Sequence, residues 1–115
     1  MMIGATRLTT FGARGAVVSW AGLATGDSGS SVDTADMADR SVQVTGTFGG
    51  ASVSLEGSND GSTWVVLNDP LGAAITFTSA GLRQVLEITR YVRPVVTGGA
   101  GSGLTVTLVA LGTGR

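Results

Sequence analysis

Hydrophobic and polar residues alternate along two neighbouring stretches near the middle of the chain. The range 40–48 alternates between apolar and polar residues, and the range 51–57 repeats this pattern. A period of two residues is typical of a strand with one buried face. Gly49 and Gly50 separate the two ranges, and glycine tolerates the positive φ angles that tight turns need. The pattern therefore predicts a β-hairpin over residues 40–57.

Turn-rich segments separate further stretches with strand character. The predicted strands cover residues 63–67, 74–78, 82–88, 90–97 and 104–111. The first of them would extend the hairpin to a three-stranded meander. The stretch 82–88 also suits one helical turn, although we favour a strand.

Two features qualify the last predicted strands. Pro94 cannot donate a ladder hydrogen bond, so its strand is predicted to lie on an edge or to be bulged. The glycine-rich segment 98–103 predicts a flexible hairpin loop before the last strand. In that strand Val109 and Leu111 make the second face apolar near the end, which predicts cover on both faces there. The first face carries Leu104, Val106, Leu108 and Ala110.

The first third of the chain lacks a sustained pattern. Residues 15–20 predict a short strand, and residues 21–39 predict a long loop with one helical turn near Asp36. We interpret Met1–Gly15 and Ala21–Asp39 as candidate extended arms, of which the first could span up to roughly 50 Å when fully extended. Both termini are expected to be docked, on this chain or on a neighbouring subunit.

About eight short strands at regular spacing predict an all-β fold, namely an antiparallel β-sandwich or jelly roll with an extended N-terminal arm. A chain of 115 residues favours a single domain. Within it, we assign residues 1–39 to the arm, short strand and loop, and residues 40–115 to the sandwich body.

The composition excludes several kinds of chemistry. The chain has no cysteine, no histidine and no lysine, so thiolate or imidazole sites and Schiff bases are excluded. A net charge of −1 argues against a nucleic-acid binder, which would show a basic excess. Nothing in the chain is long and apolar enough for a membrane span. Only 13% of the residues are charged, which favours a surface partly covered by a partner.

The carboxylates give no catalytic pattern. Glu56 and Glu87 lie on predicted strands and Asp60 and Asp69 in predicted turns, and nothing in the sequence pairs them. We interpret the aspartates as turn residues, and we predict that the protein is not an enzyme, with no catalytic residue and no cofactor.

A cation site is the weaker interpretation of the acidic loop. Asp33, Asp36 and Asp39 do not have the spacing of an EF-hand, and the segment around Asn59 and Asp60 supplies a single carboxylate. Asx turns and a helix cap account for these residues, so no metal ligand is predicted.

All the basic residues are arginines, which suit bidentate contacts across protein interfaces. The alternative explanation is a coding bias that replaces lysine throughout the chain. Arg90 and Arg93 flank Tyr91 on one predicted strand. The predicted interface residues are Arg7, Phe11, Arg14, Trp20, Arg90, Tyr91 and Arg93.

The segment ADRSVQVTGTFGGASVSLEGSNDGSTWVVL, residues 38–67, resembles small virion proteins of tailed bacteriophages. The segments 69–72 (DPLG) and 91–94 (YVRP) share this resemblance, which covers about residues 38–111 and is closest to head decoration, or cement, proteins. It implies a non-enzymatic protein on the capsid exterior, made in the bacterial cytoplasm. Its partners would be the major capsid protein and neighbouring copies in a homo-oligomer, whose contacts stabilise the head.

A second resemblance supports an alternative function. The segment GSNDGSTW, residues 57–64, is similar to a hairpin in discoidin-like carbohydrate-binding sandwiches. This resemblance implies a carbohydrate- or host-surface-binding module of a tail, baseplate or fibre. The same segment recurs in unrelated sandwiches, because Asn-Asp-Gly makes a good turn and Trp64 is expected to anchor the following strand in the core.

Overall fold

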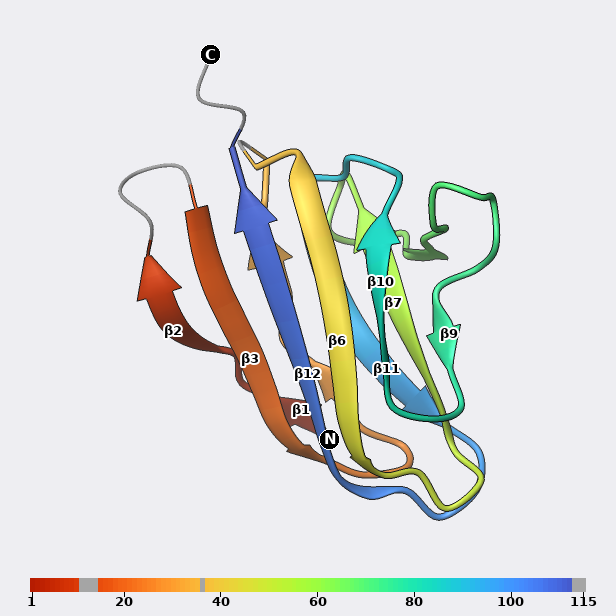
Figure 1. Cartoon of the computed structure of the whole chain (residues 1–115). Coiled ribbons are helices and arrows are strands. Elements are labelled where there is room, and N and C mark those ends of the chain that lie inside the picture. Colours follow the sequence, from red (N-terminus) through yellow and green to blue (C-terminus); the bar gives the residue numbers. More distant parts are fainter. Residues whose placement is uncertain (11–14, 36, 113–115) are drawn as a thin grey trace.

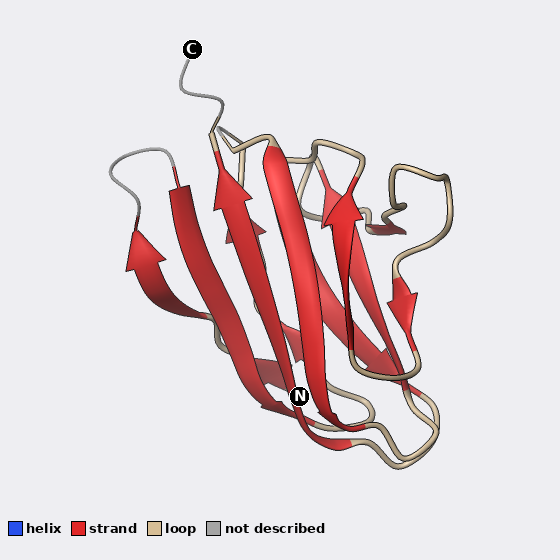
Figure 2. Cartoon of the chain, in the orientation of Figure 1, coloured by secondary structure: helices blue, strands red, loops and turns tan. Residues whose placement is uncertain are grey.

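The computed structural model describes residues 1–10, 15–35 and 37–112 and has an all-β architecture. Two sheets, one of seven strands and one of five, pack face to face (Figure 1). The described residues contain strands and loops but no helix (Figure 2), and so none that could cross a membrane. The predicted β-sandwich is confirmed.

The strands of each sheet come from all parts of the chain. The seven-stranded sheet contains β1 (Met2–Ile3), β4 (Ser28–Gly29), β5 (Val32–Asp33), β7 (Ser52–Ser58), β8 (Val65–Val66), β9 (Thr76–Phe77) and β11 (Tyr91–Thr97). The five-stranded sheet has the order β10 (Gly81–Val85), β6 (Asp39–Thr47), β12 (Ser102–Leu111), β3 (Gly15–Leu23), β2 (Thr6–Thr10). All pairings are antiparallel except that of β1 with β4.

The predicted hairpin over residues 40–57 is wrong, because β6 and β7 belong to different sheets. β6 pairs with β10 and β12, whereas β7 pairs with β11, β8 and β9. Gly49 and Gly50 do form the expected turn, with φ angles of 56° and 82°. That turn is an arch from one sheet to the other. Two strands that face one core from opposite sheets have the same alternation of apolar and polar residues as two strands of a hairpin. Periodicity therefore cannot distinguish an arch from a hairpin. Of the predicted meander, only the pairing of β7 with β8 exists.

The glycine-rich segment 98–103 is a second arch and not the predicted hairpin loop, since β11 and β12 also lie in different sheets. The two arches pack against each other through their backbones. The Ala100 N–H donates to the Gly49 carbonyl at 2.9 Å. A Cβ atom at Gly99 would lie 2.3 Å from the carbonyl carbon of Gly50. This end of the sandwich therefore closes by a contact that only glycine permits.

Pro94 lies inside its sheet and not on an edge. β11 pairs with β7 along its whole length and with β4 and β5 on the other side. The Val96 N–H donates to the Asp27 carbonyl on that second side. Backbone nitrogens two residues apart in a strand point the same way, so the Pro94 nitrogen also points to this side. It faces the break between β4 and β5, where Gly29 leaves room for the proline ring. The missing donor is tolerated because the neighbouring strand is interrupted there.

The core lies between the sheets and includes Trp20 of β3, Leu55 of β7 and Ile75 before β9. On β12 the predicted face is buried over its whole length. The expectation that the end of β12 is covered on both faces is wrong in this chain, because Leu111 is 40% exposed. The stretch 82–88 forms a strand only as far as Val85.

The described part of the predicted arm lies on the chain's own sandwich. β1 pairs with β4, and β2 pairs with β3 at the edge of the five-stranded sheet. Ile3 and Ala5 pack against the core. The predicted loop 21–39 supplies β4 and β5, and the helical turn predicted at Asp36 falls outside the described residues.

The packing of the arches predicts a large effect of a single methyl group. Gly98 and Gly99 both have positive φ, but a Cβ at Gly98 meets open space. Gly98→Ala should therefore lower the free energy of unfolding by about 1 kcal/mol. Gly99→Ala should lower it by about 2 kcal/mol more, because the backbone of Gly50 must move. Urea unfolding of both variants tests the contact, and equal midpoints would contradict it.

Candidate interaction surface

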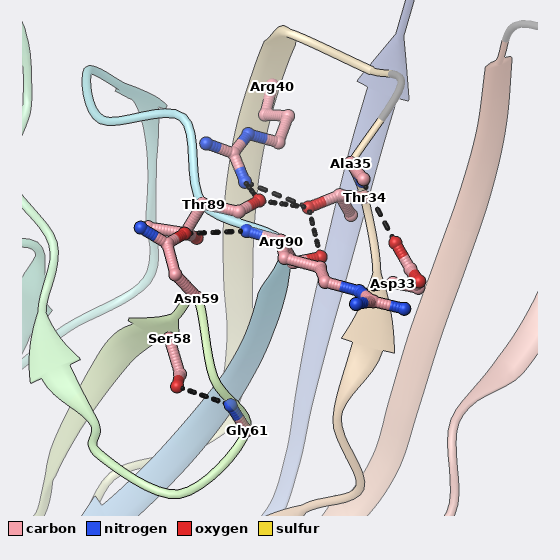
Figure 3. A network of polar contacts seen from close by, with 9 residues as sticks. All are labelled: Asp33, Thr34, Ala35, Arg40, Ser58, Asn59, Gly61, Thr89 and Arg90. Atoms are coloured by element: carbon pink, nitrogen blue, oxygen red, sulfur yellow. Dashed lines mark hydrogen bonds and ion pairs between the residues drawn. The ribbon is translucent and has the colours of Figure 1, made fainter.

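A buried guanidinium fixes one end of the sandwich (Figure 3). Arg40, at the start of β6, is only 2% exposed. Its Nη1 donates to the Thr34 hydroxyl at 3.0 Å and to the Thr89 carbonyl at 3.4 Å, and its Nη2 donates to the Glu87 carbonyl. Burial lowers the pKa of Arg40, while the Glu87 charge acts in the opposite direction. These bonds join β6 to the segments before it and after β10.

The segment that follows β10 is held from both sides. The Glu87 carboxylate accepts bonds from the Asn68 backbone N–H at 2.7 Å and from Asn68 Nδ2 at 2.6 Å. Partial burial raises the pKa of Glu87, but these bonds and the charge of Arg40 outweigh it, so the pKa is lowered overall. The Leu86 N–H donates to the Asn68 carbonyl at 2.9 Å. The start of the segment is thereby held against Asn68, and the chain bends at Glu87 and again at Arg90 on its way to β11.

The turn after β7 is closed by its own side chains. Asp60 Oδ1 accepts bonds from the N–H groups of Ser62 and Thr63, both at 2.8 Å, and from the Ser58 hydroxyl at 2.9 Å. These bonds lower the pKa of Asp60 to about 2. Asn59 accepts a bond from the Arg90 N–H at 3.1 Å (Figure 3). The interpretation of Asp60 as a turn residue is confirmed.

Three of the predicted interface residues lie at the start of β11. Tyr91 and Arg93 are on the outer row of this strand, and Arg90 directly precedes it. Arg93 donates through Nε and Nη2 to Glu56, both at 3.0 Å, and its guanidinium carbon lies 4.2 Å from the centre of the Trp64 ring. Arg90 pairs with Asp33 at 3.4 Å and lies over the Tyr91 ring at 5.0 Å. Both arginines are therefore engaged within the chain.

The other predicted interface residues are not brought together with these three. Arg7 is exposed on β2, on a different sheet. Trp20 is fully buried and donates to the Ser30 carbonyl at 2.9 Å, so it is a core residue and not an interface residue. Its place on β3, in the same row as the buried Val18, explains the error. Phe11 and Arg14 lie outside the described residues.

Sequence reasoning missed a row of exposed apolar side chains. On β10 Leu82 is 67% exposed, and in the segment that bends away after the strand Leu86 is 52% and Ile88 61% exposed. Gln84, also exposed, completes this row, which we call the β10 row. Residues 82–88 alternate in the sequence, but both alternating rows contain apolar residues. The sequence therefore does not predict which row faces outward.

A cleft of about 360 Å³ lies between the turn after β7, β8 and the segment after β10. Its lining includes Asp60, Val65, Val66, Glu87 and Thr89 but no member of the β10 row. Val65 is 63% exposed.

The outer face of the five-stranded sheet is uncharged at its centre. One cross-strand row consists of Leu82, Gln43, Thr107, Ser19 and Thr6. The next row contains Gln84, Ser41, Val109 and Val17. Neutral side chains of this kind cost less to desolvate against another protein than charged ones.

Within residues 1–10, 15–35 and 37–112, no group of three or more carboxylates that could hold a metal ion is found. Asp33 and Asp39, two of the three loop aspartates, are exposed, and Asp33 pairs with Arg90.

No protein-family model matches the chain, and no curated protein matches it. Its fold is similar to that of the SPBc2 prophage-derived protein YomS, with a TM-score of 0.63 at 10% identity, covering 90% of this chain and 97% of that one. It is also similar to part of Peruvianin-I, a cysteine peptidase from Thevetia peruviana latex, with a TM-score of 0.51 at 16% identity. That match covers 93% of this chain but 60% of the peptidase chain.

A cupin 2 domain-containing protein from Halorhodospira halophila gives a TM-score of 0.49 at 12% identity, over 93% of this chain and 64% of that one. At such identities the two likenesses above TM-score 0.5 show a shared fold. They show the fold alone, since one fold can serve unrelated functions.

The lowered pKa of Asp60 predicts a specific loss of stability in acid. A carboxyl whose pKa is about 2 in the folded state and about 3.9 when unfolded stabilises the fold above about pH 4. That contribution is lost as the pH falls toward 2. In Asp60→Asn this part of the acid dependence should disappear, whereas Glu87, whose pKa is also lowered, keeps its own part.

Melting temperatures measured from pH 7 to pH 2 test this expectation. Asp60→Ala is the control, because it removes the acceptor and should lower the melting temperature even at pH 7. An Asp60→Asn profile parallel to that of the unmodified protein would contradict the assignment.

The Arg40 contacts predict a stability effect of a different kind. Arg40→Met keeps the apolar stem but leaves the carbonyls of Glu87 and Thr89 without this donor. The free energy of unfolding should fall by about 3 kcal/mol. The exposed Arg7 is the matched control, and Arg7→Met should change stability by less than about 0.5 kcal/mol. Equal effects of the two substitutions, measured by urea unfolding, would contradict a stabilising role of Arg40.

Proposed function

We propose that this protein is a non-enzymatic structural component of a tailed-phage virion, and that it decorates and stabilises the capsid. The observation that carries the proposal is the fold likeness to a prophage-derived protein, which extends over 90% of this chain and 97% of the other. A likeness that spans almost the whole of both chains relates complete sandwiches and not a shared fragment. The resemblance of residues 38–67 to decoration proteins supports the same assignment.

The surface suits a protein whose task is to cover other subunits. The five-stranded sheet presents Ser, Thr, Gln and Val side chains, which carry no charge, so covering them costs less than covering charged side chains. The β10 row adds exposed Leu and Ile side chains that gain by burial. Such a face can add buried area across the joint between two major capsid subunits.

The mechanism that we propose is purely additive. Each copy would contact the major capsid protein and neighbouring copies, and each further contact would form at high effective concentration. Individually weak contacts would then hold the shell against the pressure of the packaged DNA. The protein would act on the virion exterior and would need no cofactor.

A carbohydrate-binding role in the tail is the second candidate, since a small cleft of about 200 Å³ is lined by Trp64, Arg93, Ser28 and Met2. Sugar binding commonly uses a free aromatic face. In Trp64 one face is covered by the Arg93 guanidinium, which is itself paired with Glu56. This arrangement favours a structural over a sugar-binding use of Trp64.

Mass spectrometry of purified virions with copy-number counting tests the proposal. A decoration protein should occur in a number comparable to that of the major capsid protein. The purified protein should also bind capsids that lack it, and it should raise the temperature at which these capsids release DNA.

A few copies per particle would overturn the capsid assignment and favour the tail. Specific binding to a glycan array by the isolated protein, lost in Trp64→Ala and retained in the surface control Leu71→Ala, would support the alternative. Leu71 is suitable as this control because it is 94% exposed and does not line the Trp64 cleft.

A further inference from the structure

β10 is an open sheet edge. It pairs with β6 over Gly81–Val85 in a regular antiparallel register without a bulge. Among the described residues, no other strand pairs with it, and Figure 1 shows it at the margin of its sheet. Every second residue of such a strand directs its N–H and C=O groups outward. β10 therefore offers a row of backbone donors and acceptors to a further strand.

The features that usually protect an edge are weak here. The seven-stranded sheet is protected because its flanking strands are only two residues long, namely β1, β8 and β9. β10 has five residues, no proline and one charged side chain, Arg83. Arg83 is turned toward its own seven-stranded sheet, because its Nη1 donates to the Ala74 carbonyl at 2.8 Å and its guanidinium lies 5.6 Å from the Phe77 ring centre. Its charge is thus drawn away from the edge.

We propose that β10 pairs antiparallel with β10 of a second copy of this chain, across a two-fold axis beside Arg83. The two five-stranded sheets would then form one continuous sheet. This inference deepens the homo-oligomer part of the proposed function by naming the interface. It rests on the backbone donors and acceptors of the open β10 edge, which a two-fold axis places opposite those of the second copy.

The backbone groups select this register. With the axis at Arg83, Gly81 lies opposite Val85 of the second copy, and the regular strands overlap over their full length. A shift toward the end of the strand is blocked, because the Leu86 N–H already donates to the Asn68 carbonyl, which occupies the edge there. The outward N–H and C=O groups of one copy can therefore bond to those of the second copy only within residues 81–85.

The side chains agree with the backbone. On the outer face Leu82 would lie opposite Gln84 of the second copy and diagonal to its Leu82 and Leu86. The leucines of both copies would thus gather around the axis and cover surface that is now exposed. Arg83 would lie opposite Arg83 of the second copy, and the bond to Ala74 directs each guanidinium toward its own chain. Residual repulsion between these charges should make the dimer stronger at high salt.

The expected dimer is weak. A single pair of five-residue strands with a few leucines buries less than the roughly 800 Å² per partner that is typical of stable complexes. In a lattice of many copies, such a contact would be strengthened by multivalency.

Sedimentation of the full chain across a wide concentration range tests the pairing. We expect a monomer–dimer equilibrium that shifts toward the dimer with salt. Leu82→Lys should weaken self-association at least tenfold, because it brings two cations near the axis. Leu71→Lys is the matched control, since Leu71 is 94% exposed and lies outside the β10 row. It should leave the equilibrium unchanged.

Cysteine cross-linking tests the register, and the absence of native cysteine gives it a clean background. Leu82→Cys and Gln84→Cys are prepared as separate proteins and mixed under mild oxidation. The mixture should form disulfide-linked dimers quickly, because directly opposite residues lie within disulfide range. Each variant alone should cross-link slowly, since diagonal residues are about 7–8 Å apart. Leu71→Cys mixed with either variant is the control.

Three results would overturn the pairing: a monomer at all concentrations, a dimer that Leu82→Lys does not affect, or mixed cross-linking no faster than that of the control. If the protein is monomeric in solution and Leu82→Lys instead abolishes capsid binding, a capsid strand and not a second copy occupies the edge. Capsid binding that persists without self-association would leave the proposed function intact.

Discussion

The guanidinium of Arg40 ties together the end of the sandwich on which the interaction surface depends. It is a charge removed from water at the start of β6, and most of its donors are met by oxygens of the segments around Thr34 and Glu87–Thr89. A buried charge is costly unless it is paired or hydrogen-bonded, so these segments must take fixed positions around it. The position of the bent segment 86–90 follows from that requirement, and Leu86 and Ile88 are exposed in it.

The same physical principle accounts for what could and could not be predicted from the sequence. Alternation identified the buried row of β12 and the strand character of β6 and β7, because one face of each strand meets the core. Alternation is silent about which sheet a strand joins, and so the arch at Gly49–Gly50 was mistaken for a hairpin. A pairing partner is a long-range property, fixed only when the two apolar faces meet.

The candidate site shows a similar division. The turn around Asp60 could be predicted, because its hydrogen bonds are made within a few residues. The grouping of Arg93 with Glu56 and Trp64, the burial of Trp20 and the exposure of the β10 row depend on strands distant in sequence. Pro94 shows the same division. A proline must lie where no partner strand needs its missing N–H, and this holds here. The reason is an interruption in the neighbouring strand, whereas the sequence predicted an edge or a bulge.

Most connections between consecutive strands run from one sheet to the other, and this has a consequence for how the chain reaches its fold. Apart from β2 with β3 and β7 with β8, strands adjacent in sequence do not pair with each other. Most ladders must therefore wait until distant segments meet, and loop closure precedes any gain from pairing. Such a topology folds slowly, and strand edges stay exposed in the meantime. A protein made in large numbers on this plan would depend on its few charges and many glycine turns to avoid association before the sandwich closes.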